Sequence, residues 1–274
     1  MLETDNILNS LIDEVDFSIL DVETTGLSPE SGDRVIEVGV VKVRSGAVVD
    51  SFTSLINPER PLSAGAFFVN KISPQMVADK PRFCEIANDL LKFLENSVLA
   101  AYNTPFDLSF IEYEFRLAGI KLPNFITLDV LKLSRSLLPG IKSYKQGNVA
   151  AALNISTNTL HRALEDVIVT SQIFSTIVGI SKAHGFNKVG DLTTNKISFN
   201  LEQTRLRMVT DALSTESNLW IKYFSPHQYE ISERVVTPHQ IIKKDNGTYL
   251  SAYCHNQKAD RNFHVGRILE IKII

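Results

Sequence analysis

Four acidic side chains in three separate short motifs place the strongest constraint on how this chain can fold. Asp21 and Glu23 lie in FSILDVETTGL, Asp107 lies in LAAYNTPFDLSF, and Asp166 lies in HRALEDVIVTSQIF. A fold that gathers these motifs concentrates about four negative charges in one pocket, where like charges in a low dielectric repel strongly. Divalent cations with hard oxygen ligands are the obvious counter-charge, and their chemistry is usually phosphodiester hydrolysis.

Composition and charge set modest bounds on the partner. With 274 residues, 44% of them apolar and 22% charged, the chain is typical of a globular protein with one large domain or two unequal ones. Its net charge is −3, but residues 1–197 carry 18 basic and 23 acidic side chains, whereas residues 198–274 carry 10 and 8. This balance excludes a DNA-binding protein with a large electrostatic footprint. It leaves room for an enzyme that grips a few nucleotides at a chain end.

The cysteines and the N-terminus predict a cytoplasmic protein. Cys84 and Cys254 lie far apart and have no metal-ligand spacing, so two free thiols in a reducing compartment are expected. The first residues carry acids and no basic leader, which is not the pattern of a signal peptide. We also expect no apolar run of membrane-spanning length and no membrane partner.

The order of elements predicts an α/β fold for the N-terminal part. Residues 17–21, 35–43 and 48–56 have the composition of three strands, with Ser45-Gly46 as a turn, and together predict an antiparallel meander. Helical periodicity follows, interrupted by a short apolar strand over 97–103. Strands first, then alternating strands and helices, fit a mixed sheet flanked by helices.

The C-terminal part predicts a second, smaller domain. Residues 182–197 lose apolar periodicity and gain Gly, Asn and Thr, so we interpret them as a linker between domains 1–181 and 198–274. One helix and then four or five short strands follow, with Asn246-Gly247 as a hairpin signal. This order predicts a small β-barrel or open β-sheet.

The spacing within each motif indicates which acids share a site. Asp21 and Glu23 lie two apart on a strand, so both side chains point to one face. Asp107 lies at a strand-to-helix junction, where a helix N-cap carboxylate is an equal alternative. His161 precedes Asp166 by five residues and can flank the same pocket, although a solvated loop histidine is the better reading of His161 alone.

Taken together, the three motifs resemble those of the DEDDh exonucleases. DVETTGL, AYNTPFDLSF and HRALED are similar to the exonuclease motifs of polymerase III epsilon-type proofreading subunits, RNase T and oligoribonuclease. The resemblance covers about residues 15–180 and implies an RNase H-like fold. It also implies two Mg²⁺ or Mn²⁺ ions, held by Asp21, Glu23, Asp107 and Asp166. His161 marks the histidine subclass, and an imidazole with an ordinary pKa of about 6.5 suits a general base near neutral pH.

The same resemblance implies how substrate is bound. The products are nucleoside 5′-monophosphates released from a 3′ end, and the terminal nucleotide is contacted by Thr24, Thr25, Gly26, Leu27, Asn103 and Phe106. For Leu27 and Phe106 a place in the apolar core is a strong alternative, because a Leu or Phe beside a turn is more often core.

The C-terminal residues resemble the WYL domain, an SH3-like or Sm-like β-barrel. The name-giving triplet is Thr248-Tyr249-Leu250 here, so the Trp is absent and a standard ligand pocket is in doubt. The resemblance implies binding of nucleic acid or a nucleotide-like ligand. The residues expected to bind it are Arg234, Tyr249, Arg261 and Arg267, and an ordinary solvated barrel surface is an equal alternative.

These expectations favour a metal-dependent 3′–5′ exonuclease that acts on single-stranded DNA. An exoribonuclease of RNase T type stays open, because the motifs serve both sugars. A regulator that senses nucleic acid or a ligand and has a vestigial nuclease domain is the third alternative. No sequence feature identifies a polymerase partner.

Overall fold

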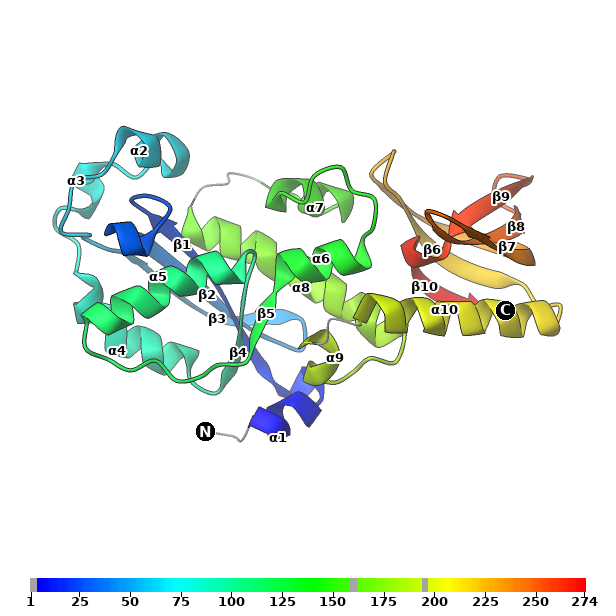
Figure 1. Cartoon of the computed structure of the whole chain (residues 1–274), viewed down its shortest axis with the longest axis horizontal. Coiled ribbons are helices and arrows are strands. Elements are labelled where there is room, and N and C mark those ends of the chain that lie inside the picture. Colours follow the sequence, from blue (N-terminus) through cyan, green and yellow to red (C-terminus); the bar gives the residue numbers. More distant parts are fainter. Residues whose placement is uncertain (1–3, 158–161, 194–196) are drawn as a thin grey trace. The chain divides into compact units, whose positions relative to one another are not determined.

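The computed structural model describes residues 4–157, 162–193 and 197–274 (Figure 1). The chain forms two compact units. The first contains the residues up to Leu131 together with 156–175, and the second contains 132–155 together with 176–274. The chain therefore leaves the first unit, returns to it, and leaves it again within one long helix, α8 (Ala163–Ala183).

A five-stranded mixed sheet forms the centre of the first unit. Its strand order is β3-β2-β1-β4-β5, in which β1, β2 and β3 are antiparallel and β4 and β5 run parallel to β1. The bounds are β1 (Asp16–Thr24), β2 (Val35–Arg44), β3 (Ala47–Leu55), β4 (Ser97–Ala101) and β5 (Thr127–Asp129). The predicted meander and mixed sheet are confirmed.

Helices cover both faces of this sheet, and the alternation of β1 decides which side chains meet them. Leu20 and Val22 pack into a core cluster with α4 (Phe83–Leu94) and α5 (Thr104–Leu117). Phe17 points the other way and contacts Phe174 of α8, with ring centroids 4.9 Å apart. Because side chains alternate along a strand, Asp21 and Glu23 lie on the α8 face of the sheet.

Shorter elements complete the first unit. They are α1 (Thr4–Asn9), the 3₁₀ turns η1 (Ile12–Glu14) and η2 (Pro29–Ser31), α2 (Ala64–Asn70) and α3 (Pro74–Val77). The predicted helical periodicity around the strand 97–103 is wrong in one place. In TLDVLKLSRSLL, residues 127–138, the first three residues form β5, and Val130–Leu137 form a helix, α6.

The second unit combines helices with an antiparallel sheet. Its helices are most of α6, α7 (Gln146–Ala152), the end of α8, α9 (Val189–Thr193) and α10 (Ile197–Ser214). The sheet has the order β10-β6-β7-β8-β9. Its strands are β6 (Leu219–Ser225), β7 (Glu230–Lys244), β8 (Gly247–Cys254), β9 (Ala259–His264) and β10 (Ile268–Ile273), with the turn η3 (Val265–Arg267) before β10.

A hydrophobic core lies between α10 and the antiparallel sheet. Val209 and Ala212 of α10 pack against buried residues of all five strands, so one helix covers one face of the sheet. The predicted order of one helix followed by short strands is confirmed. The segment predicted as a linker, 182–197, contains the end of α8 and the helix α9, whose Val189 and Leu192 are buried.

Helix α8 departs from a second expectation. Among the residues that the structure describes, one helix has a length and composition that would allow it to cross a membrane, although no such run was predicted. Of its most apolar window, 61% is buried inside the protein. The helix begins beside the sheet of the first unit and carries Asp166 in its first turn, which are features of a core helix.

Candidate metal centre

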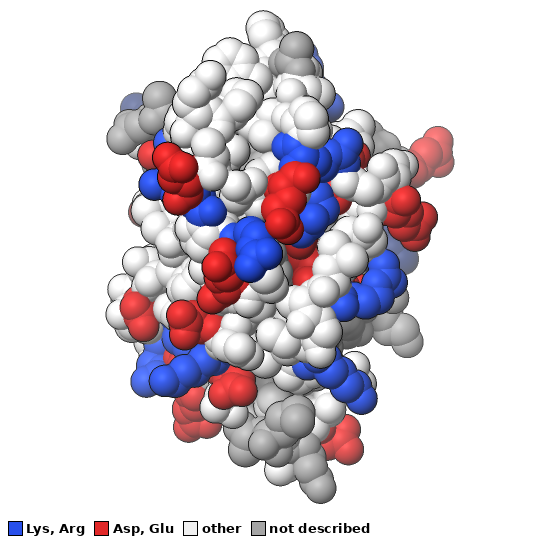
Figure 2. Space-filling model, turned by 90° about the vertical axis from the view of Figure 1, so that its left-hand side faces the viewer, with Lys and Arg blue, Asp and Glu red and all other residues white. Residues whose placement is uncertain are grey.

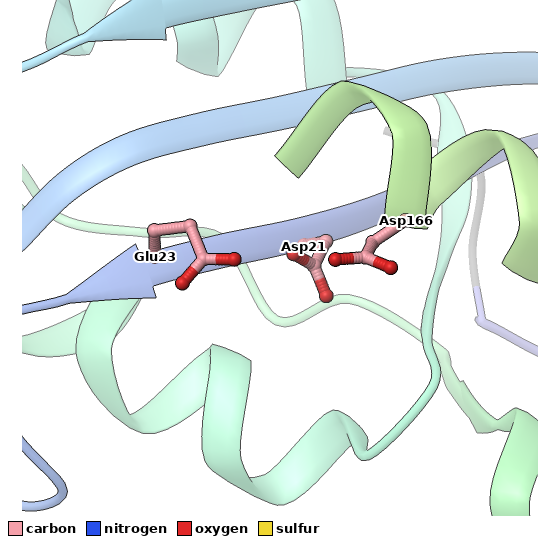
Figure 3. A group of neighbouring side chains, drawn as sticks. All are labelled: Asp21, Glu23 and Asp166. Atoms are coloured by element: carbon pink, nitrogen blue, oxygen red, sulfur yellow. The ribbon is translucent and has the colours of Figure 1, made fainter. Parts of the chain in front are cut away.

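Three of the predicted acids meet on the α8 face of the sheet. Asp21 and Glu23 project from β1, and Asp166 projects toward them from the first turn of α8 (Figure 3). Each residue offers one carboxylate oxygen such that all three oxygens lie within 4.8 Å of one another. Hard oxygen ligands at this spacing suit Mg²⁺ or Mn²⁺.

The fourth acid, Asp107, reaches the same end of the sheet from the opposite face. It lies in the first turn of α5, whose N-cap is Asn103, so Asp107 is not the capping carboxylate. The backbone N–H of Val22 donates to Asp107 Oδ1 over 3.2 Å, which ties this side chain to β1 between Asp21 and Glu23. Asp107 therefore adjoins the three-acid group without belonging to it.

The electrostatics of these carboxylates show why a cation fits. Burial, followed by repulsion from Asp107, Asp166, Glu23 and Glu37, raises the pKa of Asp21 well above its ordinary range. Burial and the neighbouring acids raise the pKa of Glu23 to about 8. Burial also raises the pKa of Asp107 to about 7, against the lowering effect of its bond from Val22. At neutral pH these groups bind protons unless a cation replaces them.

Two further acids near the centre were missed by the sequence analysis. Glu37 of β2 is buried and pairs with Arg162, and Asp129 at the end of β5 contributes to the raised pKa of Asp107. A glutamate inside the apolar run VIEVGVV was the available signal for Glu37. Asp129 had no comparable signal, because β5 itself was not predicted.

The loop after β1 is held in a defined shape beside the acids. A β-bulge interrupts the β1–β2 pairing between Glu23 and Thr24, as is common next to active sites. Thr24 Oγ1 donates to Gly26 O, and Thr25 Oγ1 bonds to Asp33. A Cβ at Gly26 would lie 2.2 Å from Asp33 Oδ2, so any side chain there would displace the Asp33 carboxylate from its bond with Thr25.

Leu27 and Phe106 were both predicted to contact the terminal nucleotide, but they lie in different surroundings. The side chain of Leu27 is 85% exposed, which excludes the core alternative for this residue. Phe106 is half-buried and packs against Phe110 and the α4–α5 core cluster, with 5.2 Å between the ring centroids. Asn103 is exposed at the start of α5.

The predicted general base, His161, lies outside the described residues. The described chain resumes at Arg162, immediately before α8. Its role as a base stays a prediction.

The four C-terminal residues predicted to bind a ligand have separate surroundings. Tyr249 of β8 contacts His264 edge to face and lies beneath the Lys244 ammonium. Arg234 donates to Ser232 Oγ, Arg261 to Gln257 Oε1 and Arg267 to the carbonyl of Pro139. Among the described residues, none of these bonds or ring contacts joins two of the four side chains, and their role in binding a ligand stays a prediction.

The surface in Figure 2 carries interspersed positive and negative side chains. A face of mixed sign does not attract a long polyanion by a uniform field.

Two family models match this chain. Residues 18–174 match the family model described as "Exonuclease", and residues 204–273 match the model described as "WYL domain". The first match contains all four acids of the centre, and the second contains α10 after its first turns and the whole antiparallel sheet.

Curated relatives match more than half of this chain. The "3'-5' exonuclease DinG" of Bacillus subtilis is 36% identical over 162 residues, which are 59% of this chain and 17% of that protein. The "DNA polymerase III subunit epsilon" of Treponema pallidum is 32% identical over 61% of this chain and 78% of its own length. The chain thus spans a small fraction of some relatives and most of others.

Solved structures share the fold. The structure "Exonuclease X in complex with 5' overhanging duplex DNA" matches with a TM-score of 0.50 and 27% identity, over 61% of this chain and 93% of that one. The nuclease domain of 3'hExo, described as a DEDDh family member bound to rAMP, matches with a TM-score of 0.55 and 18% identity, over 62% and 94%. At that identity the second likeness shows the fold alone, which is the RNase H-like fold of the first unit.

Proposed function

This chain belongs to the exonuclease family, and on that premise we propose that it removes nucleotides one at a time from the 3′ end of single-stranded DNA. The products are nucleoside 5′-monophosphates. The single observation that carries the proposal is the convergence of Asp21, Glu23 and Asp166 within 4.8 Å, with Asp107 beside them. A purely structural role does not account for so many carboxylates with raised pKa values in one place.

The carboxylates hold the ions, and the surrounding residues hold the substrate. Two divalent ions would be held by Asp21, Glu23, Asp107 and Asp166. When bound, these ions would neutralise charge at the reacting phosphate and at the departing 3′ oxygen. His161 accepts the proton of the attacking water. The exposed side chain of Leu27 contacts the terminal base, and the loop 24–26 offers its backbone to the sugar.

The helix α2 supports the proposal that the 3′ end of the DNA lies beside the loop after β1. α2 is tied to the loop after β1, because Asn70 Nδ2 donates to Thr24 O and Ser63 Oγ lies 3.5 Å from Thr25 O. The helix exposes Phe68, whose side chain is 76% exposed and lies beneath the Lys71 ammonium. An exposed ring with a cation beside the site suits a stacked base and its phosphate.

DNA is favoured over RNA because several curated relatives are named as DNA polymerase III subunits. The second unit is proposed to guide the strand or to sense a nucleotide-like ligand through Arg234, Tyr249, Arg261 and Arg267. A polymerase partner is a further proposal, supported by the same relatives.

The proposal is tested with matched DNA and RNA strands of one sequence. Purified protein with Mn²⁺ is expected to shorten a 5′-labelled DNA strand in single-nucleotide steps and to release 5′-monophosphates. Asp21→Ala is expected to abolish the shortening, because the ions lose a shared ligand. Arg44→Ala is the matched control, since it breaks an exposed ion pair with Asp16 at the other end of β1.

The outcomes separate the alternatives. Faster shortening of the RNA strand would identify an exoribonuclease. No degradation of either strand, combined with tight binding of a nucleotide or single strand, would favour a regulator with a vestigial nuclease. Early appearance of labelled fragments of scattered lengths, as internal cuts produce, would contradict exonucleolytic action.

A further inference from the structure

We propose that Glu37 and Arg162 are positioning residues for the metal centre: their ion pair fixes the start of α8 on β2, so that Asp166 meets Asp21 and Glu23. The inference rests on the proposed function and deepens it. Neither residue is needed as a ligand, and both act by fixing the place of a ligand.

Glu37 lies on the same face of the sheet as the ligands. In the antiparallel pairing of β1 with β2, Glu37 is directly opposite Glu23, and Gly39 is directly opposite Asp21. Directly opposite residues of paired strands project to the same side, with their Cβ atoms about 5 Å apart. Glu37 is therefore a fifth carboxylate beside the centre, and only 3% of it is exposed.

The oxygens of Glu37 are occupied by donors from the residues that start α8. Arg162 Nε lies 3.2 and 3.1 Å from the two carboxylate oxygens, and Arg162 Nη2 donates to Oε1 over 2.7 Å. The backbone N–H of Ala163, the first residue of α8, donates to Oε2 over 3.0 Å. A carboxylate with these partners has little capacity left for a metal ion, and it caps a helix whose N-terminus favours negative charge.

The first turn of α8 links the Glu37–Arg162 ion pair to Asp166. The N–H of Asp166 donates to the carbonyl of Arg162 over 3.0 Å. Because that bond closes the first turn of α8, the place of Arg162 on β2 sets the place of the Asp166 backbone. A shift of Arg162 would carry the Asp166 carboxylate with it.

Gly39 gives independent support for this docking. A Cβ at Gly39 would lie 2.7 Å from the carbonyl carbon of Ala163 and 2.9 Å from the nitrogen of Leu164. The backbone of α8 thus approaches β2 too closely for any side chain at that position. Glu37 holds the start of α8 by polar bonds, and Gly39 allows the helix to approach β2. These two residues lie directly opposite Glu23 and Asp21 of β1.

The test measures Mn²⁺ affinity by electron paramagnetic resonance in three variants of the full chain. Glu37→Gln keeps the shape and removes the charge, whereas Gly39→Ala keeps every charge and adds a clash. Removing a partner that orients a metal ligand typically weakens metal binding about 10–100-fold, and we expect a loss in this range for both variants.

Glu114→Gln is the matched control. Glu114 is also buried and also accepts from an arginine, Arg34, through Nε and Nη2, and from one backbone N–H, that of Val35. It holds the second half of α5, about two turns beyond Asp107. The first turn of α5 keeps its own bonds, from the Ala101 N–H to Thr104 Oγ1 and from the Val22 N–H to Asp107 Oδ1. Loss of Glu114 therefore destabilises the fold in a similar way without releasing Asp107 or moving Asp166. Thermal unfolding of each variant establishes the temperature at which all remain folded for the titration.

The results are distinguishable. Mn²⁺ binding by Glu37→Gln and Gly39→Ala equal to that of the parent protein would overturn the positioning role and leave the proposed function intact. An equal loss in Glu114→Gln would also overturn it, since general destabilisation would then suffice. If the parent protein itself binds no Mn²⁺, the proposed function fails first and the inference fails with it.

Discussion

At the scale of single residues, the raised carboxylate pKa values give a stability that depends on pH in an unusual direction. The pKa of Glu23 is about 8 in the folded protein, against an ordinary value near 4.5. Between these values the folded state keeps a proton that the unfolded chain has lost. The folded state then binds more protons, and stability falls as pH rises through this window.

We therefore expect Glu23→Gln to raise the melting temperature of the metal-free protein at pH 8 and to have a smaller effect at pH 5. The amide removes a carboxylate that is costly to ionise beside Asp21 and Asp166. Thermal unfolding in the presence of a chelator measures the difference.

The control for this prediction is Asp89→Asn, which changes an exposed carboxylate on α4. Added Mn²⁺ should stabilise the parent protein and have little effect on Glu23→Gln. If Glu23→Gln lowers the metal-free melting temperature at pH 8, the carboxylates do not repel one another as described.

Residue types and spacing predicted the acids of the centre but not the groups that hold them. Asp21 and Glu23 could be identified because two acids at a spacing of two interrupt an apolar strand. Glu37 satisfies no such pattern alone, and its partner Arg162 is 125 residues away in the chain. Likewise, the sequence could not separate Leu27, which is exposed, from Phe106, which packs partly into the core.

At the scale of elements, Thr104 joins the strands of the parallel part of the sheet to α5. It is buried, its Oγ1 accepts from the N–H of Ala101 at the end of β4, and it lies 2.6 Å from Leu128 O of β5. It is also the first residue of α5, which presents Asp107 one turn later. One hydroxyl thus connects three elements behind the metal centre.

We expect Thr104→Val to reduce the free energy of unfolding by about 1–3 kcal/mol, the usual range when buried polar groups lose their partner. The change keeps the volume and leaves the Ala101 N–H and the Leu128 carbonyl without the hydroxyl. Urea denaturation measures it.

Thr210→Val provides the comparison, because the Thr210 hydroxyl bonds to Leu206 O on the exposed side of α10. Its effect should lie within about 0.5 kcal/mol of zero. Equal effects of the two substitutions would show that Thr104 has no special connecting role.

The long, periodic elements and the wholly apolar strand β4 were predictable, whereas β5 and α9 were not. The β1–β3 meander, α4 and α10 follow from apolar spacing over nine residues or more. The three-residue β5 is too short to show a period, and its pairing with β4 comes from the sheet rather than from its own sequence. α9 has five residues in a polar stretch, so its two buried side chains gave no periodic signal.

At the scale of the whole molecule, the two regions that match family models do not coincide with the two compact units. The matched regions, 18–174 and 204–273, lie within the predicted domains 1–181 and 198–274. The compact units divide the chain differently, because residues 132–155 belong with the second unit. Within that unit, Arg267 donates to the carbonyl of Pro139, a contact between segments 128 residues apart that no sequence pattern indicated.

The proposed function requires the acids of the metal centre to bind divalent ions for phosphodiester hydrolysis. The most direct test counts the Mn²⁺ ions bound per chain at saturation and repeats the count with Asp21→Asn. We expect two bound ions per chain in the parent protein and a loss of binding in the variant. A parent protein that binds no Mn²⁺ at millimolar concentration, or an Asp21→Asn variant that binds as many ions, would contradict the proposed function.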